Sequence, residues 1–137
     1  GGNLVVQYNT AGKMLTNDIG PYPFIAGSQR VTEENAKITI TDPANALLNY
    51  PNKITNADFD NWVQERGLYF ADNIDPKYAT PLLMNDTGQS PANGALLVAD
   101  YGKGRFIYTS LAFFRQLPAG VSGAYRLFVN LLSQPKK

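Results

Sequence analysis

Two strand-like segments separated by a short glycine-containing stretch restrict the fold more than any other feature of this sequence. Residues 95–99 and 105–110 are rich in aliphatic and aromatic side chains, and Gly102 and Gly104 lie between them. Glycine reaches the positive φ values that tight hairpin turns require. These segments therefore predict an antiparallel β-hairpin, whose second strand runs directly into the aromatic and polar residues 113–116.

Four further segments have the composition of β-strands. Residues 4–8 form an apolar run, and residues 36–41 alternate polar with apolar side chains, as a half-exposed strand does. Shorter apolar runs occupy 68–71 and 81–84. The Gly- and Pro-containing residues 9–29 predict a long loop, of a kind that is often functional.

Fewer segments have helical patterns. Apolar residues spaced by three and four over 121–133 predict the clearest helix. An Asp-Pro pair predicts a helical turn over 44–49, because both residues suit a helix start. Thr55, with Asp58 three residues later, predicts a second helix that ends near Gly67. The order of these elements favours a mixed α/β sheet covered by few helices.

Composition excludes several classes of protein. The 137 residues fit a single domain, and 44% hydrophobic with 17% charged residues is typical of a folded one. The net charge is +1 and no basic block occurs, so nucleic-acid binding has no electrostatic support. No apolar run is long enough to span a membrane. The absence of Cys and His excludes disulfides, thiolate or imidazole catalysis, and zinc sites built on those ligands.

Several strings across nearly the whole chain resemble a known family, the C-terminal region of large bacterial PIG-L/LmbE-type sugar de-N-acetylases. They are GGNLVVQYNT (1–10), WVQERGLYF (62–70), YGKGR (101–105), FRQLPAG (114–120) and GAYRLF (123–128). That region is similar to class I glutamine amidotransferases of the trehalose-utilisation (ThuA-like) group. The resemblance implies a flavodoxin-like α/β fold, a mixed sheet with flanking helices, whose early strand–helix units would lie upstream of Gly1.

The chain departs from this family at the catalytic positions. An active amidotransferase of this kind needs a cysteine at a strand-to-helix elbow and a histidine after the late strand, and Phe113 stands about where the histidine is expected. The deacetylase reaction of the parent family uses a His/Asp zinc site in another domain. The resemblance therefore implies a chain without catalytic residues, metal or cofactor, which accompanies an upstream deacetylase-like domain in the periplasm or outside the cell.

Trp62, Glu65 and Arg66 form the first candidate ligand-binding group. An aromatic ring beside a carboxylate and a guanidinium group is a common way to hold a sugar. The alternative is that Trp62 packs in the core on a helix face while Glu65 and Arg66 pair locally.

Phe113, Phe114, Arg115 and Gln116 form the second candidate group. They follow the second hairpin strand, and in open α/β sheets ligands bind where strands end. Arg115 could hold a carboxylate or phosphate through two hydrogen bonds. The alternative is that the two phenylalanines cover the sheet edge and that Arg115 ties down a loop carbonyl or Glu65.

Three functions remain open from the sequence. The first is a non-catalytic accessory domain of a de-N-acetylase-like protein, with a role in domain packing or carbohydrate binding. The second is a degenerate amidotransferase-like hydrolase that uses Asp, Glu or Tyr groups around Arg115. The third is a protein–protein interaction module whose exposed sheet edge docks another chain.

Overall fold

The computed structural model describes residues 1–10 and 18–135, so residues 11–17 of the predicted loop lie outside the described part. Its helices are η1 (Ala46–Leu48) and η2 (Asn56–Phe59), both of the 3-10 type, α1 (Phe113–Gln116) and α2 (Ser122–Leu132). Its strands are β1 (Asn3–Gln7), β2 (Ile25–Ala26), β3 (Lys37–Ile40), β4 (Ala71–Asp72), β5 (Leu82–Asn85), β6 (Leu96–Tyr101) and β7 (Gly104–Thr109).

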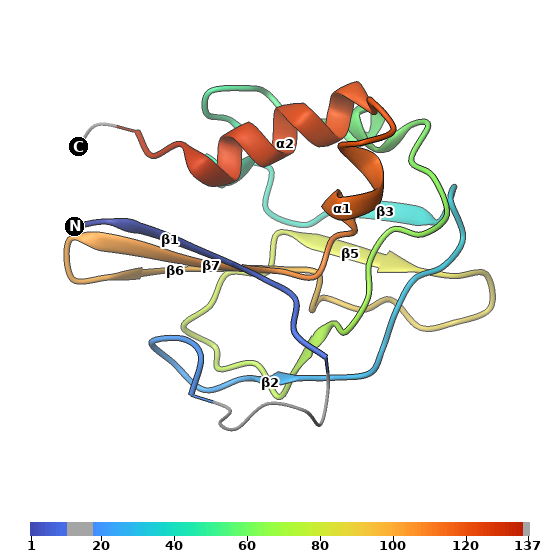
Figure 1. Ribbon diagram of the computed structural model, residues 1–137. Coiled ribbons are helices and arrows are strands. Elements are labelled where there is room, and N and C mark those ends of the chain that lie inside the picture. The colour runs from blue at the N-terminus through green and yellow to red at the C-terminus, as the bar shows by residue number, and fades with distance from the viewer. Residues whose placement is uncertain (11–17, 136–137) are drawn as a thin grey trace.

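The central sheet has three strands in the order β1-β7-β6 (Figure 1). The predicted hairpin is confirmed, since β6 and β7 pair antiparallel with Val98 opposite Ile107. The predicted first strand is also confirmed, and it lies parallel to β7, with Val5 opposite Ile107. The sheet is therefore mixed, with β7 in the middle and β1, from the start of the chain, at one edge.

Only one of the two hairpin glycines uses the left-handed region of backbone space. Gly102 has φ 57°, as the first central residue of a two-residue hairpin turn often does. Gly104 instead allows close approach, because a Cβ added there would lie 2.8 Å from the carbonyl oxygen of Gly2. The hairpin therefore needs each glycine for a different reason.

The two faces of the central sheet belong to two buried clusters. On one face Val98 and Ile107 pack with the inner side of α2, including Leu127 and Leu131. Figure 1 shows α2 lying over this face. On the other face the ring of Phe24 packs against side chains from β6 and β7, together with Tyr78 and others (Phe24, Ala71, Tyr78, Leu97, Ala99, Phe106, Tyr108). Burial on both sides explains why β6 and β7 are almost continuously apolar.

Two small antiparallel sheets surround the central one. β3 pairs with β5, which confirms the strands predicted at 36–41 and 81–84. β2 pairs with β4, which covers only the end of the strand predicted at 68–71. Tyr69 has φ 55°, a conformation that no β-strand residue adopts, and this explains the shortened strand.

The C-terminal helix is confirmed as α2, with Ala124, Leu127 and Leu131 on its buried face. The prediction for 55–67 is wrong beyond its first turn. The capping box of Thr55 and Asp58 is present, but η2 ends at Phe59, because Asp60 is extended, with ψ 145°, and Asn61 follows with φ 63°. The turn predicted over 44–49 is the shorter η1, capped by Asn45 rather than by the Asp-Pro pair.

The described chain is thus a mixed α/β fold with small sheets and few helices. In residues 1–10 and 18–135, no helix combines the length and the apolar character needed to cross a bilayer.

Candidate functional site

The carboxyl ends of the parallel strands β1 and β7 lie at the same edge of the sheet, where open α/β sheets bind ligands. Tyr8 directly follows β1. The chain that leaves β7 passes through Leu111 and Ala112 into α1, which begins with Phe113 and Phe114. This edge therefore brings together residues from the start and the end of the sequence.

Tyr69 reaches the same edge from the middle of the chain. Its carbonyl oxygen accepts hydrogen bonds from the hydroxyl groups of Ser110, at 2.9 Å, and Tyr108, at 3.3 Å. These bonds hold Tyr69 in its left-handed conformation. Such conformations cost free energy and concentrate at functional sites. Among the described residues the other non-glycine residues with positive φ are Asn61, Gln64 and Asn73.

Three rings form an aromatic cluster at this edge, which consists of Tyr8, Tyr69 and Phe114. The rings of Tyr8 and Tyr69 stack with centroids 5.5 Å apart, and the ring of Phe114 lies 5.7 Å from that of Tyr8. Phe114 is 41% exposed, although phenylalanine usually lies inside a protein. The two tyrosines are partly buried. The cluster thus presents aromatic surface to solvent.

An ion pair borders the aromatic cluster. The guanidinium of Arg115 stacks over the ring of Phe114, 4.9 Å from its centroid, and its Nε donates to Glu65 Oε1 at 3.1 Å. The Arg115 side chain is 41% exposed, so the pair itself adds little stability. The pairing of Arg115 with Glu65, left open by the sequence, is therefore present, and it places two polar groups next to the exposed ring.

Gln116 positions the loop that carries Glu65. Its side chain is fully buried, and its amide oxygen accepts from the N–H of Val63 at 2.7 Å. Its amide nitrogen donates to the carbonyls of Val63 and Glu65, at 3.0 and 3.1 Å. Gln116 was predicted as a ligand-binding residue, but these bonds use its amide within the protein. It acts here by fixing Glu65 beside Arg115.

Trp62 lies in the core, as the alternative interpretation of the sequence expected, although not on a helix. Its indole N–H donates to the carbonyl of Asp58 at 2.9 Å, and its ring packs between Phe59 and Phe113. Trp62 is 2% exposed and Phe113 only 1%, so neither ring offers a surface to a ligand in this structure.

Arg66 is also interior. Its guanidinium donates to the carbonyls of Phe59 and Ala36, the second at 2.9 Å, and so joins two loops. Burial lowers the pKa of Arg66, and the nearby carboxylate of Asp60 partly opposes this effect. Arg66 therefore connects the segments below the site. Of the seven predicted residues, the structure brings Glu65, Phe114 and Arg115 together at the surface.

Tyr8 and Tyr69 are the residues that sequence reasoning missed. Both lie within predicted strands, at 4–8 and 68–71, and nothing in the local sequence distinguishes them from residues that pack in the core. The available signal was the parallel pairing of β1 with β7, which would have placed Tyr8 beside the residues after β7.

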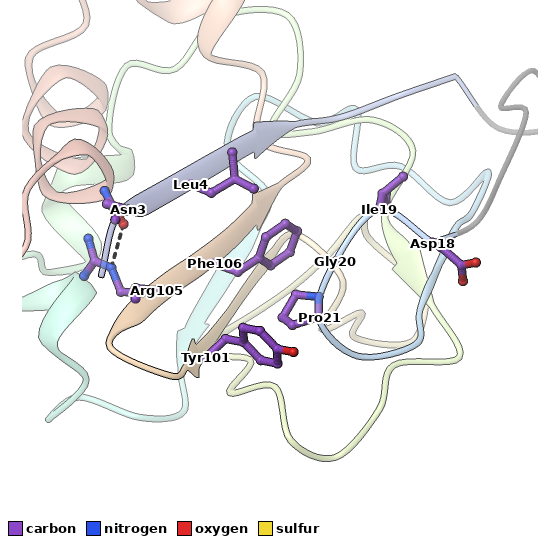
Figure 2. A pocket seen from close by; sticks show the side chains of 11 residues that line it. Asn3, Leu4, Asp18, Ile19, Gly20, Pro21, Tyr101, Arg105 and Phe106 are labelled. Atoms are coloured by element: carbon purple, nitrogen blue, oxygen red, sulfur yellow. Dashed lines mark hydrogen bonds between the residues drawn. The ribbon is translucent and has the colours of Figure 1, made fainter.

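Apart from the aromatic cluster, the structure has a hollow that we call the hairpin pocket, on the sheet face opposite α2 (Figure 2). Its volume is about 510 Å³, and its apolar walls come from β1, the β6–β7 hairpin and the 18–21 segment (Leu4, Ile19, Pro21, Tyr101 and Phe106). The hairpin pocket and the aromatic cluster share no residue.

The groups that the described part of the chain places at the sheet edge where β1 and β7 end are the aromatic cluster and the Arg115–Glu65 pair. Within the described residues, no three or more Asp and Glu side chains are grouped so that they could hold a metal ion. Comparison with family models, curated proteins and solved structures gives no match to this chain. Its function is therefore inferred from the geometry of the site and from the resemblance of its sequence.

Proposed function

We propose that this chain is a non-catalytic accessory domain of a bacterial PIG-L/LmbE-type de-N-acetylase-like protein, and that it binds carbohydrate at the aromatic cluster. The observation that carries the binding role is the exposed ring of Phe114, which lies next to Tyr8, itself stacked on Tyr69, and beside the Arg115–Glu65 pair. The accessory role rests on the sequence resemblance.

The cluster has the two kinds of group that a sugar needs. The C–H face of a pyranose ring is apolar, so it gains free energy when it covers an exposed aromatic ring. Its hydroxyl groups both donate and accept hydrogen bonds. Arg115 supplies N–H donors and the carboxylate of Glu65 supplies acceptors, and Arg115 lies against the Phe114 ring.

The absence of catalytic groups supports an accessory role. The chain has no Cys and no His, and the position expected for the amidotransferase histidine is the fully packed Phe113. The flavodoxin-like, amidotransferase-like form of the fold belongs to the same proposal. It is supported by a central mixed sheet in which β1 runs parallel to β7 and α2 packs over one face.

Calorimetric titration with glucosamine, N-acetylglucosamine and their short oligomers tests the binding role. The unmodified chain is expected to bind at least one of these sugars. Phe114→Ala is expected to lower the association constant about tenfold, because it removes the stacking surface. Tyr50→Ala is the matched control, since Tyr50 is also an exposed aromatic residue, at 44%, and lies outside the cluster. Absence of heat with every sugar would contradict carbohydrate binding. An equal decrease of the association constant in both variants would contradict binding at the aromatic cluster.

A further inference from the structure

The outer edge of β1 exposes main-chain hydrogen-bonding groups. The Gly2 carbonyl accepts from the N–H of Arg105 at 2.9 Å, which fixes the register of the parallel ladder. Alternate residues of a parallel strand bond to the same neighbour, so Leu4 and Val6 face β7. Asn3, Val5 and Gln7 consequently turn their N–H and C=O groups away from the sheet.

These outward groups are largely free in the described part of the chain. The carbonyl of Gln7 accepts a weak hydrogen bond, at 3.3 Å, from the side-chain amide of Asn9. No hydrogen bond from residues 1–10 or 18–135 reaches the main chain of Val5 outside the ladder. Unpaired edges of this kind accept a further strand.

The side chains of β1 do not protect this edge. Proteins commonly block edge strands with charged residues or proline, and β1, with the sequence NLVVQ, contains neither. Leu4 is 57% exposed, so a large apolar side chain of this edge strand faces solvent. A strand added next to β1 would bury Leu4.

The hairpin pocket lies beside this edge. Leu4, Phe106, Tyr101 and Pro21 line the pocket, and Figure 2 shows Phe106 between Leu4 on one side and Pro21 and Tyr101 on the other. Tyr101 is 64% exposed and Leu4 is 57% exposed, so two large apolar side chains border the opening. The pocket volume of about 510 Å³ is ample for one large apolar or aromatic side chain.

From this arrangement we infer a peptide-binding site: an extended segment of another polypeptide adds to the outer edge of β1 and inserts a large apolar side chain into the hairpin pocket. Main-chain hydrogen bonds to Asn3, Val5 and Gln7 supply the strand pairing, and the pocket selects the side chain. This site is separate from the aromatic cluster, so it stands whether or not the chain binds carbohydrate.

A peptide fits this surface better than a second copy of the chain. Pairing of β1 with the β1 of another copy would present only Leu4 and Val6 on the pocket side of the sheet. Neither carries an aromatic ring to pack against Phe106 in the pocket. A small apolar molecule could occupy the pocket but would leave the outward main-chain groups of Val5 unpaired.

Titration of the ¹⁵N-labelled chain with a synthetic peptide, acetyl-Thr-Val-Thr-Phe-Thr-Val-Thr-amide, tests the inference. We expect saturable shifts of the amide signals of Asn3, Val5 and Gln7. A peptide with alanine in place of phenylalanine is expected to bind about tenfold more weakly, because it lacks the anchor. Tyr101→Ala should lower the affinity for the phenylalanine peptide by a similar factor and leave the affinity for the alanine peptide unchanged.

Val5→Pro tests the main-chain pairing at the outer edge of β1 most directly. It removes an outward N–H without removing a ladder bond to β7, so the fold is expected to persist, whereas peptide affinity should fall at least about tenfold. Val129→Ala, at an exposed position of α2, is the matched control. Three results would overturn the inference: no saturable shift at millimolar peptide, unchanged binding by a folded Val5→Pro chain, or a dimer of the unmodified chain that Val5→Pro dissociates.

Discussion

Asp86 joins two loops that are distant in the sequence. Its carboxylate accepts hydrogen bonds from the N–H of Thr32 at 3.0 Å, from the hydroxyl of Thr32 at 3.1 Å and from the N–H of Glu33 at 2.9 Å. Burial alone would raise the pKa of Asp86. These hydrogen bonds, with a contribution from Arg30, outweigh burial and lower the pKa below its usual value. The ionised form therefore stabilises the native state.

Asp86→Asn is expected to lower the free energy of unfolding by about 1–3 kcal/mol at pH 7, because it removes charge-assisted hydrogen bonds. The folded pKa is the lower one, so this stabilisation is complete above the unfolded pKa, about 4, and is lost as the pH falls through the folded pKa. Urea unfolding of both proteins from pH 7 to pH 3 should show the difference shrinking.

Asp72→Asn serves as the control for this pH series, since Asp72 is exposed and should change stability by less than about 0.5 kcal/mol. A difference between Asp86→Asn and the unmodified chain that stays constant down to pH 3 would contradict the role assigned to Asp86.

At the scale of elements, α2 meets η2 through a backbone contact. A Cβ added at Gly123 would lie 1.9 Å from the carbonyl oxygen of Asp58, and backbone atoms cannot rotate away as a side chain can. The same helix is anchored beyond this contact by Asn130, whose buried amide donates to the carbonyls of Leu47 and Asn52 at 2.8 Å.

Gly123→Ala should therefore destabilise the protein, although alanine is the better helix former by about 1 kcal/mol. We expect a net loss of about 1–2 kcal/mol in the free energy of unfolding, because overpacking outweighs propensity. Denaturant unfolding measures this loss. Ser122→Ala, at an exposed position of the same helix, should be neutral or slightly stabilising. A more stable Gly123→Ala protein would disprove the close contact.

Elements with strong local signals were predictable, and those shaped by distant partners were not. The β6–β7 hairpin and α2 carry their own turn glycine and apolar spacing. The helix predicted over 55–67 fails because the chain from Asn61 onward bonds to remote groups. The side chain of Gln116 forms hydrogen bonds with the main chain of Val63, and the guanidinium of Arg66 donates to the carbonyl of Ala36. Such contacts override local propensity, and a sequence window does not contain them.

The same reasoning explains what was predictable about the candidate site. Its position after β7 followed from the hairpin, so Phe114 and Arg115 could be named, as could the pairing of Arg115 with Glu65. Tyr8 and Tyr69 could not, because their approach depends on the parallel β1–β7 pairing and on the left-handed backbone at Tyr69.

At the scale of the whole molecule, the two ends of the described chain lie close together. Gly1 and Pro135 line the same surface hollow, and Figure 1 shows the start of β1 and the end of α2 on one side of the molecule. The hydrogen bond between Asn3 and Arg105 spans 102 positions of sequence, so the central sheet closes a long loop.

A circular permutant that joins residue 137 to Gly1 through a short Gly/Ser linker, and opens between the exposed Gln89 and Ser90, is expected to fold to a similar stability. It should refold several-fold faster, because β1 then follows β7 after only α1, α2 and the linker. Stopped-flow refolding measures the rate. A permutant that refolds no faster would show that β1–β7 pairing does not limit folding.

The parallel pairing of β1 with β7 also affects how this polypeptide is made. Translation supplies β1 well before β7, because Asn3 pairs with Arg105, 102 positions later in the sequence. During that interval β1 has no partner strand in the nascent chain, so its leucine and valine side chains are exposed to ribosome-associated chaperones. The yield of folded protein is therefore expected to depend on the order in which the ribosome supplies the strands as well as on the contacts that they make.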